Sequence, residues 1–270
     1  MYMKFIHSLL IAGAALASAA ALSSCTVKED RVPCPCYLNV SFTDREAIGE
    51  TPVGLLGWRD AELFRTSINV TQHDPYWVKA VEKGFVDFSA WHGADKMTGN
   101  GHTFVIAEGN QCDSLYAFFD HVDCTGEMAY SEVTFHKQFC TVFLDIRKSA
   151  AAMAGFSFQV EGNTCGFDLF GYNAVEGPFS YLALPVPGEN VVSFRIPRQI
   201  DNSMTVTIYL DGAKVGKFPL GEFIARLGYN WNAEDLQDVY VAIDLVAGLI
   251  TIRVEGWEQG MDFDIREIIY

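Results

Sequence analysis

Positively charged residues are scarce in this sequence. It contains 19 Lys and Arg against 34 Asp and Glu, a formal net charge of −15 over 270 residues. A protein that binds nucleic acid needs a basic face to neutralise phosphates, so this balance argues against nucleic acid as a main partner. An acidic balance instead favours a soluble surface whose copies repel one another.

Common catalytic and metal-binding motifs are also absent. No G-x-S-x-G elbow, P-loop or G-x-G-x-x-G loop occurs, and no two histidines have the i, i+4 spacing of a helical metal site. A glycosidase carboxylate pair could be hidden among the 34 acids, but the sequence gives no way to choose two of them. We therefore expect no enzyme activity, no cofactor and no metal.

The apolar content is high enough for a packed core. Half of the residues are hydrophobic, 13% are aromatic and 20% are charged, which excludes a wholly disordered chain. The length suits one large or two ordinary domains. The sequence contains no internal repeat and no low-complexity tract.

The N-terminus has the features of a secretory signal. Lys4 provides the positive start, residues 5–22 form an Ala-rich apolar stretch, and Leu22-Ser23-Ser24-Cys25 ends it. This ending resembles a bacterial lipobox, in which the cysteine receives a diacylglyceryl group and becomes the first mature residue. An unmodified cysteine near a conventional cleavage site is the alternative. We expect removal of residues 1–24 and a membrane anchor of palmitate-type acyl chains on Cys25.

The residues after Cys25 concern localisation. Lys28-Glu29-Asp30 is similar to the lysine-plus-acid signal that sends Bacteroidetes lipoproteins to the outer face of the outer membrane. A solvated, charged tether is the alternative. We expect a lipid-anchored protein of the outer membrane that is exposed at the cell surface and does not cross the bilayer.

Six cysteines remain when Cys25 is set aside. An even number in an exported chain permits disulfides, although six cysteines allow 15 connectivities. Two of them flank the apolar run 115–119 and could close a hairpin, namely Cys112 and Cys124. Neither the spacing of Cys34 and Cys36 nor that of Cys112 and Cys124 matches a structural zinc site. Buried free thiols are the other interpretation. The candidates for disulfides are Cys34, Cys36, Cys112, Cys124, Cys140 and Cys165.

Period-two alternation dominates the chain and predicts many short strands. Leu38, Val40 and Phe42, for example, alternate with polar neighbours. Further strands are predicted at 63–70, 103–107, 115–119, 136–147, 156–160, 181–186, 191–196, 204–210, 239–244, 250–254 and 262–269. Asp211-Gly212 between two of these runs predicts a tight hairpin. Many strands without alternating helices are typical of antiparallel β-sandwiches.

Helices are expected only in the last third. Pro219 precedes an amphipathic segment over 220–227 and Gly228 follows it, while a second short turn is expected to begin at Asn232. The length favours two sandwiches, with a break in the polar segment 126–131. We therefore predict a signal peptide over 1–24, a first domain with its tether over 25–130, and a second domain over 131–270.

Several segments of the second half occur in a distinctive order. They are Ile208 to Gly212, Phe218 to Ile224, Gly228 to Trp231, Asp238 to Asp244 and Ile250 to Trp257. With Cys34-Pro35-Cys36 after the lipobox and His136-Lys137-Gln138-Phe139-Cys140 at mid-chain, this order resembles the FimB and minor-fimbria anchor family of Bacteroidetes, the fimbrillin-associated anchor lipoproteins.

The resemblance implies an all-β protein with two tandem transthyretin-like antiparallel β-sandwich domains and one or two short helices in the second. Such a protein holds the base of a fimbrium, or pilus, at the outer membrane through its lipid, and in related systems limits fimbrial length. Subunits of this superfamily join by donating a strand to a neighbour's sandwich. Residues 262–270 are the candidate strand for pairing with a pilin subunit, and an ordinary edge strand is the alternative.

A surface lipoprotein that binds glycans is the alternative function. Aromatic side chains can form a platform on which sugars stack, although burial in a sandwich is the commoner fate of tryptophan. The tryptophans considered for such a platform are Trp58, Trp77, Trp91, Trp231 and Trp257.

Overall fold

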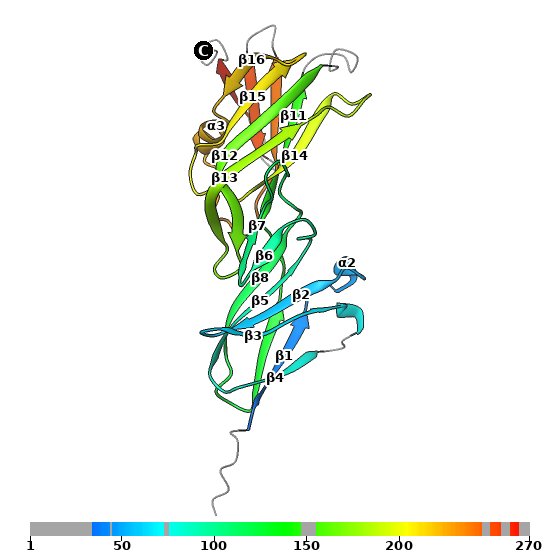
Figure 1. Ribbon diagram of the computed structural model, residues 1–270, viewed down its shortest axis with the longest axis vertical. Coiled ribbons are helices and arrows are strands. Elements are labelled where there is room, and N and C mark those ends of the chain that lie inside the picture. The colour runs from blue at the N-terminus through cyan, green and yellow to red at the C-terminus, as the bar shows by residue number, and fades with distance from the viewer. Residues whose placement is uncertain are drawn as a thin grey trace, which may run out of the picture. The chain divides into compact units, whose positions relative to one another are not determined.

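Figure 1 shows the computed structural model, which describes residues 34–43, 45–72, 76–146, 155–244, 249–254 and 260–264. Its contacts group Met1–Pro35 and Cys36–Tyr270 as two separate units. The second unit contains all the described strands and helices, and they form two β-sandwiches.

The first sandwich packs two sheets on one core. Its strands are β1 (Cys36–Phe42), β2 (Val53–Trp58), β3 (Glu62–Ile68), β4 (Trp77–Val81), β5 (Phe85–His92), β8 (Tyr116–Asp123), β9 (Met128–Val133) and β10 (His136–Lys137). One sheet has the order β4-β1-β9 and the other the order β10-β8-β5-β2-β3. Leu38 and Val40 of β1 are fully buried between them, as the alternation of β1 predicts.

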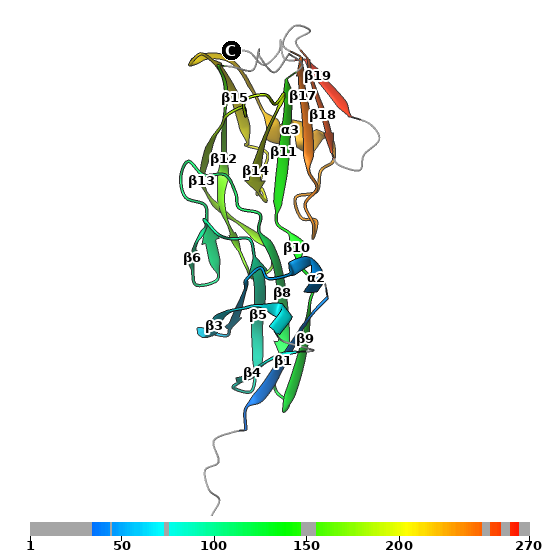
Figure 2. The same cartoon turned by 90° about the vertical axis from the view of Figure 1, so that its right-hand side faces the viewer.

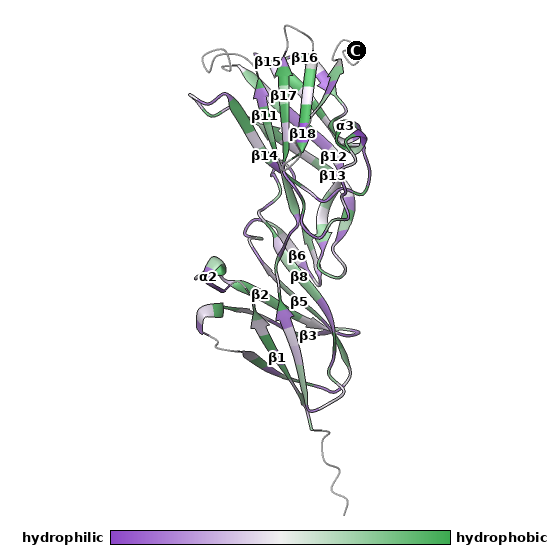
Figure 3. Ribbon diagram, turned by 180° about the vertical axis from the view of Figure 1, so that it is seen from behind, coloured by the Kyte–Doolittle hydropathy of each residue, from purple (hydrophilic) through white to green (hydrophobic). Residues whose placement is uncertain are grey.

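The second sandwich also has two sheets. Its strands are β11 (Phe139–Ile146), β12 (Phe156–Asp168), β13 (Asn173–Ala183), β14 (Val191–Pro197), β15 (Thr205–Leu210), β16 (Ala213–Phe218), β17 (Val239–Asp244), β18 (Leu249–Val254) and β19 (Met261–Asp264), joined by β6 (Thr98–Asn100) and β7 (Thr103–Val105). One sheet has the order β14-β11-β17-β18-β19. The other has the order β16-β15-β12-β7-β6, with β13 also paired to β12. Figure 3 shows that hydrophobic residues gather in the strands.

The two sandwiches share one strand order. The sheet β4-β1-β9 of the first corresponds to β14-β11-β17 of the second, and β3-β2-β5-β8 corresponds to β13-β12-β15-β16. In each, the first strand runs parallel to the seventh strand of this shared order, β1 to β9 and β11 to β17, while the other described pairs are antiparallel. The predicted all-β sandwich fold is confirmed, and one parallel pair in each sandwich is added to it.

Some strands escaped the sequence analysis because they do not alternate. All of β2 except its last residue is buried, because its two faces serve different cores: Leu55 packs in the first core and Leu56 in the second. In β5, the three consecutive residues 88–90 are buried, so the alternation is lost there too. The segment 126–131, chosen as the break between domains, includes the first four residues of β9, whose alternation was hidden by the small inward residues Ala129 and Ser131.

Turns and helices follow their local signals in part. The α-helix α3 (Leu220–Arg226) begins after Pro219 as predicted, and Phe223 stacks on Phe263 of β19 at 4.0 Å, so α3 packs between the two sheets (Figure 2). The residues from Asn232 onward are not helical. Instead, the side-chain oxygen of Asn230 accepts the Asn232 N–H at 2.9 Å and holds a turn.

Three smaller features complete the fold. One α-helical turn, α2 (Arg45–Ile48), and a 3-10 turn, η2 (Val70–Gln72), lie in the first sandwich. The hairpin between β15 and β16 turns at Asp211 and Gly212, whose φ values of 49° and 80° fit the predicted tight turn. No helix in the described ranges is long and apolar enough to cross a membrane.

The division into domains stays a prediction. The residues on either side of the predicted boundary, 130 and 131, both belong to β9. The core of the second sandwich also includes residues that precede this boundary, among them Leu56, Phe104 and Leu115.

Candidate functional site

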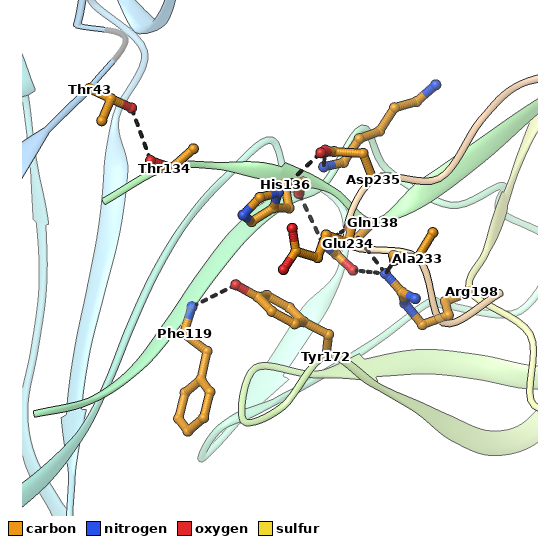
Figure 4. Close-up of polar contacts among 11 residues, drawn as sticks. Thr43, Phe119, Thr134, His136, Gln138, Tyr172, Arg198, Ala233, Glu234 and Asp235 are labelled. Atoms are coloured by element: carbon orange, nitrogen blue, oxygen red, sulfur yellow. Dashed lines mark hydrogen bonds and ion pairs between the residues drawn. The ribbon is translucent and has the colours of Figure 1, made fainter. Parts of the chain in front are cut away.

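The segment from His136 to Cys140, which carries part of the family resemblance, contacts the loop that precedes β17. The backbone of Lys137 in β10 donates its N–H to Asp235 at 2.7 Å and accepts the N–H of Leu236 at 3.0 Å. The ring of His136 lies 3.1 Å from the other carboxylate oxygen of Asp235. These hydrogen bonds hold the loop that precedes β17 against β10 (Figure 4).

A shielded ion pair lies next to this contact. The ammonium group of Lys137 is 2.6 Å from Asp238, and the same carboxylate oxygen accepts the N–H of Thr141 at 2.6 Å. Both charged side chains are less than one-fifth exposed. Lys137 also lies over the ring of Phe139, 4.9 Å from its centre.

Asp235 is held in its charged form. Burial pushes the pKa of this carboxyl upward, but the hydrogen bonds from the Lys137 backbone and the His136 ring outweigh it, so the pKa is lowered. The contact between the loop and β10 is therefore strongest when Asp235 is ionised.

Arg198, directly after β14, donates hydrogen bonds to the same loop. Its side chain is buried and donates to the Trp231 carbonyl, to the Ala233 carbonyl at 2.8 Å and to the side-chain oxygen of Gln138 at 2.6 Å. No carboxylate of the described residues lies within ion-pair distance of it. Burial lowers the pKa of Arg198, although the neighbouring Tyr229 opposes this. Figure 4 shows Arg198, Gln138 and the loop converging.

Two further polar groups brace the site. The Tyr229 hydroxyl donates to the Gln237 carbonyl at 2.6 Å, and the Cys140 thiol donates to the Thr141 carbonyl at 3.7 Å. The Tyr172 hydroxyl, from the turn between β12 and β13, accepts the Phe119 N–H of β8 at 3.0 Å. Burial raises the pKa of Tyr229, and it raises the pKa of Cys140 to about 12. Neither group is ionised at neutral pH.

A cavity of about 450 Å³ opens beside this network. Tyr172, Arg198, Trp231 and several asparagines line it. Within the described part of the chain, no three metal-ligating side chains gather to hold an ion. The hydrogen bonds of this network hold the loop before β17 against β10 and the end of β14.

The predicted cysteine sites have different fates. Cys25 lies outside the described residues, and its lipidation stays a prediction. The structure records the other six cysteines as free thiols: Cys34 is exposed, Cys165 is half-buried, and Cys36, Cys112, Cys124 and Cys140 are buried. Their disulfides also stay a prediction.

Within the described range 76–146, the structure does not contain the hairpin that Cys112 and Cys124 were expected to close. Cys112 packs in the second core, donates its backbone N–H to the Arg195 carbonyl and accepts a hydrogen bond from the Arg195 side chain, whereas Cys124 packs in the first core. The strand β8 between the two cysteines is extended, with a rise of about 3.3 Å per residue. It therefore keeps them far apart instead of folding back.

The exposed aromatic residues are not the predicted tryptophans. Trp77 and Trp231 are buried, Trp58 and Trp91 are half-buried against the core, and Trp257 lies outside the described residues.

Exposed tyrosines gather instead at the sheet β4-β1-β9. Tyr37, Tyr76 and Tyr130 are 48%, 41% and 60% exposed. The rings of Tyr76 and Tyr130 meet edge to face at 5.9 Å, and Tyr37 pairs with the exposed Met128. The outward alternation of β9 could have indicated this face.

The C-terminal strand candidate lies at a sheet edge. Of residues 262–270, those up to Asp264 belong to β19, which pairs only with β18 in the described structure. The other residues of the candidate lie outside the described ranges.

Comparison with known proteins gives a fold-level match. No family model and no curated protein matches the sequence. A candidate polysaccharide-binding protein from Bacteroides thetaiotaomicron has a TM-score of 0.59 at 14% identity, covering 84% of this chain and 98% of that chain. The fimbrial anchor protein Mfa2 from Porphyromonas gingivalis has 0.58 at 11% identity, covering 83% and 98%.

A candidate adhesin from Bacteroides ovatus is similar to the same extent. Its TM-score is 0.57 at 12% identity, with 84% of this chain and 96% of that chain covered. These identities are too low to carry an activity across, but the coverage includes nearly the whole of each neighbour. The resemblance stated from the sequence is thus confirmed at the level of the fold: this chain has the sandwich fold of Bacteroidetes fimbrial anchor and adhesin proteins.

Proposed function

We propose that this chain is an outer-membrane lipoprotein that anchors the base of a fimbrium at the cell surface and has no enzyme activity. The observation that carries the proposal is the fold shared with the fimbrial anchor protein Mfa2 over 98% of that chain. The lipobox-like segment that ends at Cys25 supports it from the sequence. The similarity to a candidate adhesin from Bacteroides ovatus agrees with it.

The lipid provides the attachment. Each buried methylene of an acyl chain contributes about 0.8 kcal/mol, so several chains on one cysteine hold a protein on a membrane almost permanently. The mature chain would then begin at Cys25, and the residues before Cys36 would link the lipid to β1. Cleavage at Arg31 would release the lipid and is not expected in the working protein.

Strand pairing provides the contact with a pilin subunit. The edge strand β19 leaves one side without a strand partner in the described structure, and a pilin strand would satisfy its free backbone groups. Its first residue, Met261, is 42% exposed and offers an apolar contact. A lipid-bound subunit takes a partner on one side only, which supports a role in limiting fimbrial length.

Replacing Cys25 with alanine in the native host tests the proposal. We expect fimbriae to leave the cells and to appear in the medium by electron microscopy, with a normal or increased length. Cys165→Ala is the matched control, because this cysteine is half-buried in the second sandwich and should leave fimbriae on the cells. Fimbriae that stay on Cys25→Ala cells would contradict the proposal.

Glycan binding is the second candidate function. The tyrosines exposed at the sheet β4-β1-β9 favour it, because sugars stack on exposed aromatic rings. A Tyr37→Ala, Tyr130→Ala variant should lose retention on polysaccharide gels if this face binds glycans. Equal migration of the variant and the original protein on every gel tested would remove this candidate.

A further inference from the structure

Two buried cysteines meet at the start of the first strand. Cys36 is the first residue of β1 and Cys124 follows the end of β8. Both side chains are fully buried in the same core, and burial together with the neighbouring Cys36 raises the pKa of Cys124. They are distant in the sequence, and nothing in their spacing indicates that they pair.

The backbone around them explains the meeting. Cys36 pairs with Val81 of β4. Cys124 exchanges two backbone hydrogen bonds with Gly84, which lies three residues after Val81. The next residue of β1, Tyr37, donates its N–H to the Glu127 carbonyl at 2.8 Å. The turn between β4 and β5 therefore brings the start of β1, in one sheet, against the end of β8, in the other.

We propose that Cys36 and Cys124 form a disulfide that joins the two sheets of the first sandwich where the chain enters β1. Cys34 is exposed, and the other buried cysteines, Cys112 and Cys140, pack in the second core. Of the connectivities open to the six cysteines, the geometry therefore selects this pair.

The oxidation is balanced by thiol–disulfide exchange with a disulfide oxidant, RSSR. The thiols of Cys36 and Cys124 lose two protons and two electrons, the bond between their sulfur atoms forms, and RSSR is reduced to two RSH. The attacking group is a thiolate. Burial, reinforced by the neighbouring Cys36, raises the pKa of Cys124 to about 12 in the folded protein. The bond would therefore form while the chain folds.

The position of the bond suggests a mechanical role, which rests on the proposed anchoring function. Tension between a lipid on Cys25 and a fimbrium would enter the fold at Cys36. Without the disulfide, this load acts on the hydrogen bonds of β1 with β4 and β9. With it, a covalent link passes the load directly to the opposite sheet, so β1 cannot be pulled out alone.

Peptide mapping tests the bond itself. The full-length protein is extracted from native cells in detergent, its free thiols are alkylated under denaturing conditions without reductant, and it is digested with trypsin and chymotrypsin. Cleavage at Tyr116 separates Cys112 from Cys124. We expect a linked peptide joining Cys36 to Cys124, which disappears on reduction and persists in a Cys34→Ser variant.

The outcome is decisive in either direction. Alkylation of both Cys36 and Cys124 without reduction would overturn the proposal, and so would a link from Cys124 to Cys34. The lipid state of Cys25 is read from a different peptide of the same digest. Failure of the lipoprotein proposal is therefore distinguished from failure of the disulfide.

Shear tests the mechanical role. Cells carrying Cys36→Ser or Cys124→Ser are vortexed beside cells carrying the control Cys165→Ala, and fimbriae released into the medium are counted. We expect at least a threefold rise in release for the first two variants at an equal amount of surface protein. Release equal to the control would overturn the mechanical role. If Cys25→Ala also releases none, the anchoring function itself fails.

Discussion

Replacing Arg198 with methionine tests whether the mid-chain network holds the fold together. The buried guanidinium donates to the Glu234 carbonyl at 3.4 Å, which also accepts from Gln138, and to three further acceptors, namely the carbonyls of Trp231 and Ala233 and the side chain of Gln138. Methionine has a similar length but donates nothing. The substitution therefore leaves these three further acceptors without a donor while largely keeping the packing.

The magnitude follows from two opposing effects. A buried acceptor left without a partner costs about 1 to 3 kcal/mol, so three would cost roughly 3 to 9 kcal/mol if none were rehydrated. Removing a buried charge that lacks a carboxylate partner recovers part of this. We expect the free energy of unfolding to fall by about 2 to 4 kcal/mol.

Urea denaturation followed by tryptophan fluorescence measures the loss. Arg198→Lys should lose as much stability as Arg198→Met, because one ammonium group keeps the buried charge but cannot reproduce the planar set of donors. Arg226→Met is the control: Arg226 is 61% exposed and 3.9 Å from Glu222, so its loss should stay below about 0.5 kcal/mol. A loss below about 1 kcal/mol for Arg198→Met, or full rescue by lysine, would refute the reasoning.

Three other predictions concern the fold. In Gly166→Ala, the new Cβ would lie 2.2 Å from the Phe104 carbonyl oxygen of β7, so we expect a fall in melting temperature, whereas Gly126→Ala, with no contact below 3.7 Å, should leave it unchanged. Burial lowers the pKa of His92 below its ordinary value of 6.5, despite the opposing charge of Asp95, so folding favours the neutral ring. Stability should be fully present above pH 6.5 and decrease as the pH falls below it, and His92→Gln should flatten this decrease in denaturation curves. Cys36→Ser should cost about 2 to 4 kcal/mol in non-reducing buffer and far less in reducing buffer, and equal losses in both would contradict the disulfide.

The sequence predicted strands in which large apolar residues alternate with polar ones. β1 and β17 alternate cleanly and were found, and so was the turn at Asp211 and Gly212. β2 was not found, because Leu55 and Leu56 enter different cores and remove the alternation. Its burial on both faces depends on the tertiary arrangement, which local periodicity does not report.

The candidate site was visible only as separate motifs. His136, Lys137 and Trp231 belong to segments quoted for the family resemblance, but their connection runs through Asp235 and Arg198, which had no motif. Contacts that join residues so distant along the chain leave no signal in spacing. The same is true of the meeting of the Cys36 and Cys124 thiols.

The repeated strand order also left no repeat in the sequence. Topology depends on which faces are buried and on how the turns connect, and different side chains can meet those requirements. The sandwiches differ at one edge: β17 is covered by β18, whereas β9 has no further strand beside it in the described structure. This difference gives the second sandwich the hairpin that ends in β19, the strand proposed for pilin pairing.

Gold labelling at the cell surface tests the anchoring claim most directly. An epitope tag is inserted after Gly188, in the loop between β13 and β14, where a side chain added at the glycine would meet no other atom within 4 Å. Electron microscopy then locates the label relative to each fimbrium. The account predicts label at the cell-proximal end of the fimbriae. Label along the fimbrial shafts, or on the cell surface away from fimbriae, would contradict it.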